Sequence, residues 1–104
     1  MKVLFDKEYL SLLYRTGNGD NKHRFQPQVV KKYVKVIDLM IAVPDVNSLR
    51  QYISLNYEHL VGDKVMLSSV RVNNQYRIEF EEYVEGEETI ATICNIVELS
   101  NHYQ

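Results

Sequence analysis

The sequence has only one cysteine, Cys94, among its 104 residues. A lone thiol cannot form an internal disulfide framework, so the composition is typical of a protein from a reducing cytoplasm. Cys94 lies inside an apolar run, where we expect it to fill the core. Long apolar stretches are lacking too, since none approaches the roughly 20 residues that span a bilayer. The N-terminus also meets Asp6 too early for a signal peptide. We therefore expect a cytoplasmic protein with no membrane partner.

Motifs that mark common catalytic sites are missing as well. The sequence shows no metal-ligand spacing, glycine-rich phosphate loop, nucleophile elbow or paired-carboxylate signature. His23 and His59 have no partner that the sequence identifies. We expect no metal site and no cofactor, and we expect both histidines to be ordinary surface residues.

The chain also lacks an excess of basic residues. Its 12 lysines and arginines stand against 14 acidic residues, for a net charge of −2. Affinity for nucleic acid comes mainly from counterion release by basic side chains, which usually form a basic face. Here most basic residues precede residue 51, so strong binding to free RNA is not expected, and an RNA substrate would have to be delivered by another component. Six glutamates crowd a later hairpin: Glu79, Glu81, Glu82, Glu85, Glu87 and Glu88.

The length fits a single domain, residues 1–104, with one modest core. The N-terminal part predicts a short strand at 2–5 and then an amphipathic helix. Asp6 is placed to cap this helix, and Gly17 is placed to end it.

A second, longer helix is predicted after a polar, glycine-bearing loop at 17–26. Pro27 suits its first turn and Pro44 stops it. Its apolar residues repeat with helical spacing, so we expect the two helices to pack together. The apolar positions are Val30, Tyr33, Val34, Ile37, Met40 and Ile41.

Residues 45–59 fit either a short helix or an extended connection, and the sequence leaves this open. Beyond them apolar residues alternate, which predicts one strand from 65 to 72 and another from 76 to 80. A third strand is predicted from about residue 89 to 99, and its nearly continuous apolar content favours burial on both faces. Helices followed by an antiparallel meander predict an α+β fold.

The loop between the first two strands of this meander can be placed from the faces of the sheet. A two-residue turn would set Val70 against Arg77, whereas a three-residue loop at 73–75 sets Val70 against Ile78 and keeps the apolar residues together. We prefer the three-residue loop. It makes Arg71 and Arg77 direct cross-strand neighbours, an arrangement that like charges disfavour unless an anion or a carboxylate lies between them. Such a pair is suited to hold a phosphate.

Ordinary structural roles compete with this interpretation. Glu79 lies diagonal to Arg71 on the same face, and a surface ion pair between them would be worth only about 0 to 1 kcal/mol. Lys64 follows a Gly-Asp turn, where lysine is most often solvated. His102 and Tyr103 lie at the chain end, where residues are commonly frayed. Spacing alone favours these roles over a functional site.

Three segments together resemble a known family. They are 60–64, which reads Leu-x-Gly-Asp-Lys, then 69–80, which reads Ser-Val-Arg-Val-Asn-x-Gln-Tyr-Arg-Ile-x-Phe, and an apolar strand followed by a terminal histidine. This pattern resembles the HigB branch of the RelE/ParE toxins from bacterial toxin–antitoxin systems. The resemblance implies a small α+β domain, with N-terminal helices packed on a small twisted antiparallel β-sheet.

The resemblance also implies an activity. Toxins like these are metal-independent, ribosome-dependent endoribonucleases that cut messenger RNA through attack of the ribose 2′-hydroxyl on the adjacent phosphate. In that chemistry Arg77 and Arg71 would bind the scissile phosphate, and Lys64 would add charge stabilisation or act as acid or base. His102 matches the terminal histidine that takes part in proton transfer. Tyr103 is placed to stack on a base, as aromatic side chains do with single-stranded RNA.

Two departures from the family pattern concern this site. Many relatives read Asp-Tyr-His at the terminus, whereas this chain reads Asn101-His102-Tyr103, so the tyrosine follows the histidine. Asn101 is counted with Tyr103 among the expected RNA contacts. The basic-Gly continuation after the turn is replaced by Val65-Met66, which removes a positive charge.

The expected partners follow from the same resemblance. They are the ribosome with its mRNA and a cognate antitoxin, expected to be a helix-turn-helix DNA-binding protein. Lys31, Lys32 and Lys35 form a candidate ribosome contact, although a helix face of this kind is more often merely solvated. Two other functions stay open: a ParE-like inhibitor of DNA gyrase, which needs no terminal histidine, and a catalytically inactive antitoxin-binding module.

Overall fold

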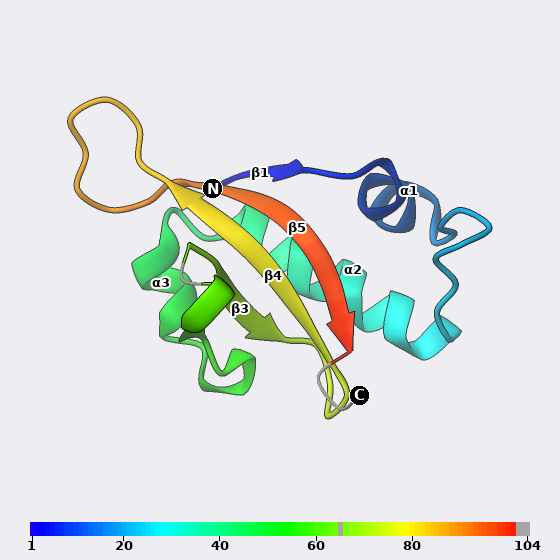
Figure 1. The fold of residues 1–104 in the computed structure, drawn as a ribbon. Helices are drawn as coiled ribbons and strands as arrows, with labels where there is room; N and C mark the ends of the chain where they lie inside the picture. The colour runs from blue at the N-terminus through cyan, green and yellow to red at the C-terminus, as the bar shows by residue number, and fades with distance from the viewer. Residues whose placement is uncertain (65, 102–104) are drawn as a thin grey trace.

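In the described residues, a five-stranded sheet and the helices on one of its faces form two layers (Figure 1). The computed structural model describes residues 1–64 and 66–101, with Asp63 by its backbone alone. The elements are β1 (Lys2–Phe5), α1 (Glu8–Thr16), α2 (Pro27–Ala42), α3 (Val46–Arg50), β2 (Glu58–His59), β3 (Ser68–Arg71), β4 (Tyr76–Tyr83) and β5 (Ile93–Asn101), with 3-10 turns at Ile53–Leu55 and Gly62–Lys64. The strand order is β1-β5-β4-β3-β2. The expected α+β class, with helices packed on a mostly antiparallel sheet, is confirmed.

The first helix begins later than an Asp6 cap would require. α1 starts at Glu8, and the residue before it is the N-cap. The backbone N–H of Asp6 donates to the carbonyl of Ile96 at 2.8 Å, which keeps Asp6 in the extended ladder. The predicted Asp6 cap is therefore wrong. The predicted end is confirmed, because Gly17 follows the helix with φ +79°, a conformation that glycine adopts freely.

The second helix follows the predicted pattern closely. α2 has Pro27 in its first turn and ends ahead of Pro44. Tyr33 is fully buried and its hydroxyl donates to the carbonyl of Leu10 in α1 at 2.8 Å, so the two helices pack together as expected. Ile41 differs from the prediction, since 44% of it is exposed. The buried positions are Val29, Val30, Tyr33, Val36, Ile37 and Met40.

The segment 45–59, which the sequence leaves open, contains a short helix, a 3-10 turn and the short strand β2. Asp45 caps α3, because its carboxylate accepts from the backbone N–H of Ser48 at 2.8 Å. After the 3-10 turn, Asn56 takes φ +43°, a left-handed conformation that asparagine tolerates better than most residues. This turn sends the chain into β2 at the edge of the sheet.

The β3–β4 hairpin has the predicted three-residue loop. Val70 pairs with Ile78 and Arg71 pairs with Arg77, so the apolar residues share one face and the arginines share the other. The side-chain oxygen of Asn73 closes the loop by accepting from two following backbone N–H groups at 2.8 and 2.7 Å. Such local bonds are the reason that asparagine favours turns.

Two features of the sheet differ from the sequence prediction. β1 pairs with β5 in parallel, so the sheet is mixed rather than a pure antiparallel meander. β3 begins at Ser68, because the N–H of Leu67 closes a turn onto the carbonyl of Lys64 at 2.8 Å. The predicted strand start at Val65 lies outside the described residues.

β5 also begins later than the sequence suggests, at Ile93 rather than near residue 89. Thr92 holds the end of the β4–β5 loop: its N–H donates to the carbonyl of Tyr83 at 3.1 Å, and its hydroxyl donates to Glu85 at 2.7 Å. Burial along β5 alternates, so the expected burial on both faces is wrong. The buried residues of β5 are Cys94, Ile96 and Leu99.

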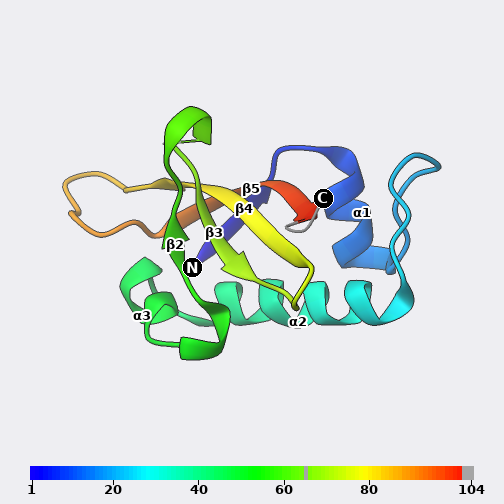
Figure 2. The ribbon, with the colours of Figure 1, turned by 60° about the horizontal axis from the view of Figure 1, so that its bottom comes forward.

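The two faces of the sheet have different neighbours. In Figure 2, α2 lies on one side of the sheet, and the turn at Gly62–Lys64 rises on the other. The helix side holds the apolar core, in which residues of α1 and α2 pack with β3, β4 and β5. Of the helices in the described chain, none combines the length and apolar content that crossing a bilayer requires.

Candidate functional site

A polar surface lies on the side of the sheet away from α2, and we call it the open face. Side chains alternate along β4, which turns Ile78 and Phe80 to the core and turns Arg77 and Glu79 to the open face. Lys64 reaches this face from the β2–β3 turn. The strand residues in register with Arg77 and Glu79 or with their neighbours on this face are Glu58, Ser69, Arg71, Glu98 and Ser100.

Arg77 is only 7% exposed and is held by hydrogen bonds on several sides. Its Nε donates to the hydroxyl of Ser69 at 2.9 Å, and one terminal nitrogen donates to the carbonyls of Asn56 at 2.7 Å and Ser69 at 3.3 Å. The half-exposed carboxylate of Glu58 lies 3.9 Å from the same nitrogen. These contacts fix the plane of the guanidinium, whose donors already have a rigid geometry.

Arg71 lies directly opposite Arg77, as the predicted register requires. Its side chain is exposed and turns to its own hairpin loop, where it donates to a loop carbonyl at 3.2 Å and to the side chain of Asn74. The considered ion pair between Arg71 and Glu79 is wrong, because Glu79 pairs with Lys64 instead. The open face therefore holds one fixed arginine and one exposed arginine side by side.

Lys64 and Glu79 form an ion pair across the open face. The ammonium nitrogen of Lys64 donates to both carboxylate oxygens of Glu79, at 3.0 and 2.8 Å. Glu79 is 7% exposed, whereas about half of the Lys64 side chain is exposed, at 48%. The bond to Glu79 raises the pKa of Lys64, and the charge of Glu98 acts in the same direction. Lys64 is therefore a paired cation rather than the solvated turn residue of the ordinary interpretation.

The charges around Arg77 balance. Among the described residues near it on the open face, the cations are Arg71, Arg77 and Lys64, and the carboxylates are Glu58, Glu79 and Glu98 on three strands. A further carboxylate, Glu81, lies along β4 on the same face and accepts from Asn95. The surface is thus not a strongly basic patch, in agreement with the mild charge of the whole chain.

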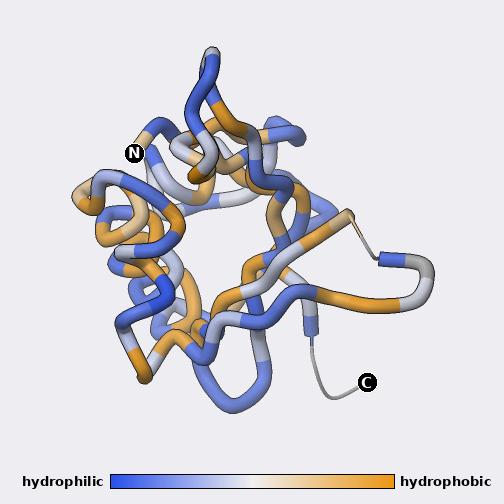
Figure 3. Tube along the Cα trace, turned by 90° about the vertical axis from the view of Figure 1, so that its left-hand side faces the viewer, coloured by the Kyte–Doolittle hydropathy of each residue, from blue (hydrophilic) through white to orange (hydrophobic). Residues whose placement is uncertain are grey.

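The hairpin between β2 and β3 stands out from the body of the protein, with hydrophobic stretches along its arms (Figure 3). Val61 is 82% exposed and Met66 is 78% exposed. Lys64 lies between them in the sequence, so exposed apolar side chains flank the cation that reaches Glu79.

The other predicted site residues lie apart from this surface or outside the described chain. Lys31, Lys32 and Lys35 are exposed on α2, which covers the opposite face of the sheet. Asn101 ends β5 and pairs with Tyr76 of β4. His102 and Tyr103 lie outside the described residues.

Sequence reasoning missed the groups that orient Arg77. Ser69 and Glu58 lie opposite each other in the β2–β3 pair, and the alternation of β3 alone is a signal for Ser69. The carbonyl of Asn56 has no such signal, because a backbone acceptor in a turn leaves no mark in the residue pattern. Glu79 was noted, but as a partner for Arg71.

A second polar cluster lies at the edge of the core. The hydroxyl of Tyr57 donates to the carboxylate of Glu82, which also accepts from the hydroxyl of Ser68. Burial raises the pKa of Tyr57 to about 12, and the bond to Glu82 acts in the same direction. His59 contacts the Ser68 hydroxyl at 3.2 Å through Nδ1, and Arg50 lies over the Tyr57 ring at 4.9 Å. His59 thus has a partner that the sequence did not reveal.

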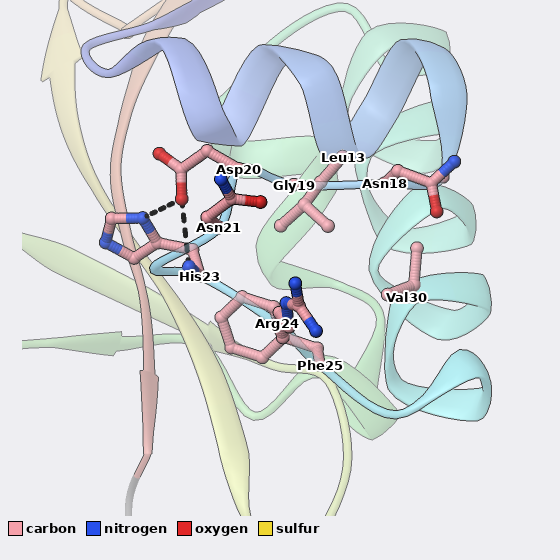
Figure 4. A pocket seen from close by; sticks show the side chains of 10 residues that line it. Leu13, Asn18, Gly19, Asp20, Asn21, His23, Arg24, Phe25 and Val30 are labelled. Carbon is pink, nitrogen blue, oxygen red and sulfur yellow. Dashed lines mark hydrogen bonds and ion pairs between the residues drawn. The ribbon is translucent and has the colours of Figure 1, made fainter.

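A pocket of about 360 Å³ lies between the 17–26 loop and the two long helices (Figure 4). In this loop Nδ1 of His23 contacts Asp20 at 2.8 Å, and its ring stacks on Tyr9 with centroids 3.7 Å apart. The hydrogen bond from His23 lowers the pKa of Asp20. These contacts order the loop. Among the described residues, no group of three or more histidine, cysteine or acidic side chains is placed to hold a metal ion.

Comparison with known protein families shows to which family the chain belongs. A family model described as the RelE-like toxin of the type II toxin–antitoxin system HigB matches residues 3–95. The chain belongs to this family. No curated protein matches it. As a type II toxin, the HigB-like chain has a cognate antitoxin as its partner, and toxins of the RelE/HigB family are typically ribonucleases.

A solved structure supports the fold of this HigB-like toxin. The YoeB/ParE toxin from Agrobacterium tumefaciens superposes with a TM-score of 0.54, over 99% of this chain and 100% of that one. The two sequences are 17% identical, so the likeness concerns the fold alone.

Proposed function

We propose that this HigB-like toxin is a ribosome-dependent endoribonuclease that cuts messenger RNA by attack of the 2′-hydroxyl on the adjacent phosphate. The observation that carries the proposal is Arg77, which is held on the open face with Arg71 as its direct cross-strand neighbour. Two guanidiniums side by side repel one another, and a bound phosphate would relieve that repulsion.

The proposed roles follow the needs of the reaction. Arg77 and Arg71 bind the scissile phosphate and stabilise the charge of the pentacoordinate transition state. Lys64 adds charge stabilisation or acts as acid or base. A base must take the proton of the 2′-hydroxyl and an acid must protonate the leaving 5′-oxygen, and His102 is assigned to this proton transfer. Tyr103 and Asn101 are assigned to contacts with the RNA.

Delivery by the ribosome fits the balanced charge of the open face. A neutral surface gains little affinity from counterion release, so free RNA would bind weakly. Lys31, Lys32 and Lys35 supply a separate basic surface on α2, which we assign to ribosomal RNA. The proposed antitoxin is a helix-turn-helix DNA-binding protein that covers the open face or blocks entry to the ribosome. The cytoplasm is the proposed place of action.

Induced expression in cells tests this function. We expect the wild type to arrest growth and to produce new mRNA 5′ ends, and we expect His102→Ala and Arg77→Ala to lose both effects. Growth arrest without new 5′ ends would replace the proposal by the gyrase-inhibiting alternative. No arrest at all would favour an inactive antitoxin-binding module, an alternative that the pairing of Lys64 with Glu79 supports.

A further inference from the structure

Glu79 is an unusual residue for a surface meant to bind phosphate. Glu79 is 7% exposed and lies on the same face of β4 as Arg77, two positions along the strand. Both of its carboxylate oxygens accept from the ammonium of Lys64, at 3.0 and 2.8 Å. A buried negative charge thus lies at the centre of the proposed site and occupies one of its cations.

The surroundings of Glu79 show why it holds Lys64. Its cross-strand neighbours are Ser69 on β3 and Glu98 on β5, and two carboxylates directly opposite one another repel. Lys64 is the cation that compensates this pair, since both Glu79 and Glu98 favour its charged form. The side chain of Lys64 is half exposed and extends from a turn at the tip of a hairpin, so it can be reached from solvent.

A carboxylate that presents two oxygens to an ammonium resembles a phosphate that presents two oxygens to the same group. We propose that Glu79 is a positioning residue that restrains the site: its carboxylate takes, on Lys64, the place of an RNA phosphate group. Binding of RNA then requires Lys64 to exchange Glu79 for the phosphate. This inference rests on the proposed function and adds to it a built-in competitor for the substrate.

The pairing of Lys64 with Glu79 explains how a site with three cations has little net charge. A phosphate that approaches Arg77 also meets the charge of Glu79 nearby, and removing that charge would both free Lys64 and remove a repulsion. Lysine suits such an exchange because its ammonium is a point charge on a flexible stem, with donors that rotate to a new acceptor.

Equilibrium binding of a single-stranded RNA made of 2′-O-methyl nucleotides, without ribosomes, tests the exchange. We expect Glu79→Gln to bind about fivefold to tenfold more tightly than the wild type, a gain of the size that one freed ion-pair partner supplies. We also expect the slope of log affinity against log salt to become steeper by about 0.7, because the wild type leaves the Glu79 carboxylate unpaired on binding, and the cation that this carboxylate takes up offsets one counterion released from the RNA.

Glu81→Gln is the matched control. Glu81 lies on the same face of the same strand, but it accepts from the side chain of Asn95 at 2.8 Å instead of from a lysine. The Glu81→Gln substitution removes the same charge from the chain as Glu79→Gln, and it should leave the RNA affinity and the salt slope near the wild-type values. The double variant Lys64→Met with Glu79→Gln should lose the gain of Glu79→Gln.

Two outcomes would overturn the inference. In the first, Glu79→Gln binds the RNA with the same affinity as Glu81→Gln. In the second, Glu79→Gln is folded, as circular dichroism shows, and binds the RNA more weakly than the wild type. If Glu79→Gln fails to fold, NMR of the wild type tests the exchange instead. We expect the signal of the Lys64 ammonium to shift when the RNA is added. A signal that does not shift would overturn the exchange. The RNA cannot be cleaved, so a binding gain stands even for a chain that never cuts mRNA. Cleavage by the wild type without such a gain overturns only the restraint.

Discussion

The Nε of Arg77 lies 2.9 Å from the hydroxyl of Ser69 and donates a hydrogen bond to it across the β3–β4 ladder. The side chain is therefore oriented by the neighbouring strand and by the carbonyl of Asn56, before any substrate binds. Such preorganisation is what stabilisation of a developing charge requires.

Replacing Arg77 by lysine should abolish growth arrest and the new mRNA 5′ ends, because an ammonium cannot reproduce the fork that contacts Ser69 and Asn56. It should also lower the free energy of unfolding by about 1–3 kcal/mol, since buried acceptors lose their donors. Chemical denaturation measures this loss. Arg71→Lys is the control: Arg71 is exposed, so we expect reduced cleavage with a stability change within about 0.5 kcal/mol. If Arg77→Lys and Arg71→Lys lowered the free energy of unfolding equally, the proposed structural role of the Arg77 contacts would be wrong.

The lysines of α2 should contribute to ribosome binding and not to binding of the scissile phosphate. We expect the variant with Lys31, Lys32 and Lys35 all changed to glutamate to cosediment poorly with ribosomes, because the basic surface becomes acidic. A variant with three exposed lysines elsewhere changed in the same way, Lys2, Lys7 and Lys22, keeps the total charge change equal. Unaltered cosedimentation of the α2 variant would end the assignment.

Removing the hydroxyl of Tyr57 should weaken the fold without affecting cleavage. Tyr57→Phe leaves Glu82 with one donor fewer at the edge of the core, which costs about 1–3 kcal/mol when a partly buried charge is involved. Thermal unfolding measures the cost, and Tyr52→Phe, at a 45% exposed position, is the control. Loss of cleavage by a folded Tyr57→Phe variant would instead assign this cluster to catalysis.

Stability should fall at alkaline pH in a way that depends on Cys94. Burial raises the pKa of this thiol from 9.0 to about 12, so the folded state keeps a proton that the unfolded state releases. The stabilising contribution is complete below about pH 9 and is lost as the pH rises toward 12, with a slope of about 1.4 kcal/mol per pH unit. Urea unfolding between these limits should therefore show a steeper decline for the wild type than for Cys94→Ala. Parallel curves would contradict the assignment.

Local patterns were sufficient to predict much of the fold. The helical repeat around Tyr33 and the alternation around Ile78 each have one dominant solution, because any other arrangement exposes apolar surface. The hairpin register followed from the same reasoning. The parallel pairing of Lys2 with Ile93 could not be predicted this way, since it joins opposite ends of the chain and has no turn to set it. The Asp6 cap failed for the same reason, because a distant strand holds its backbone.

The site was predicted less completely than the fold. The adjacency of Arg71 and Arg77 came directly from the register. The pairing of Lys64 with Glu79 did not, because it depends on how the β2–β3 hairpin curves over the sheet, and no periodicity encodes that curvature. One of the contacts that orient Arg77 is made by the backbone carbonyl of Asn56. Every residue type has such a carbonyl, so the sequence does not show which residue supplies the contact.

The partnership of β1 with β5 has a consequence for synthesis. Residues 2–5 are translated about 90 residues before their partners in the sheet at 93–96. Long-range pairing of this kind delays folding until both segments exist. A nascent chain that ends before residue 93 therefore lacks β5, the strand that joins β1 to β4, so the sheet of the toxin cannot be completed until β5 has been translated.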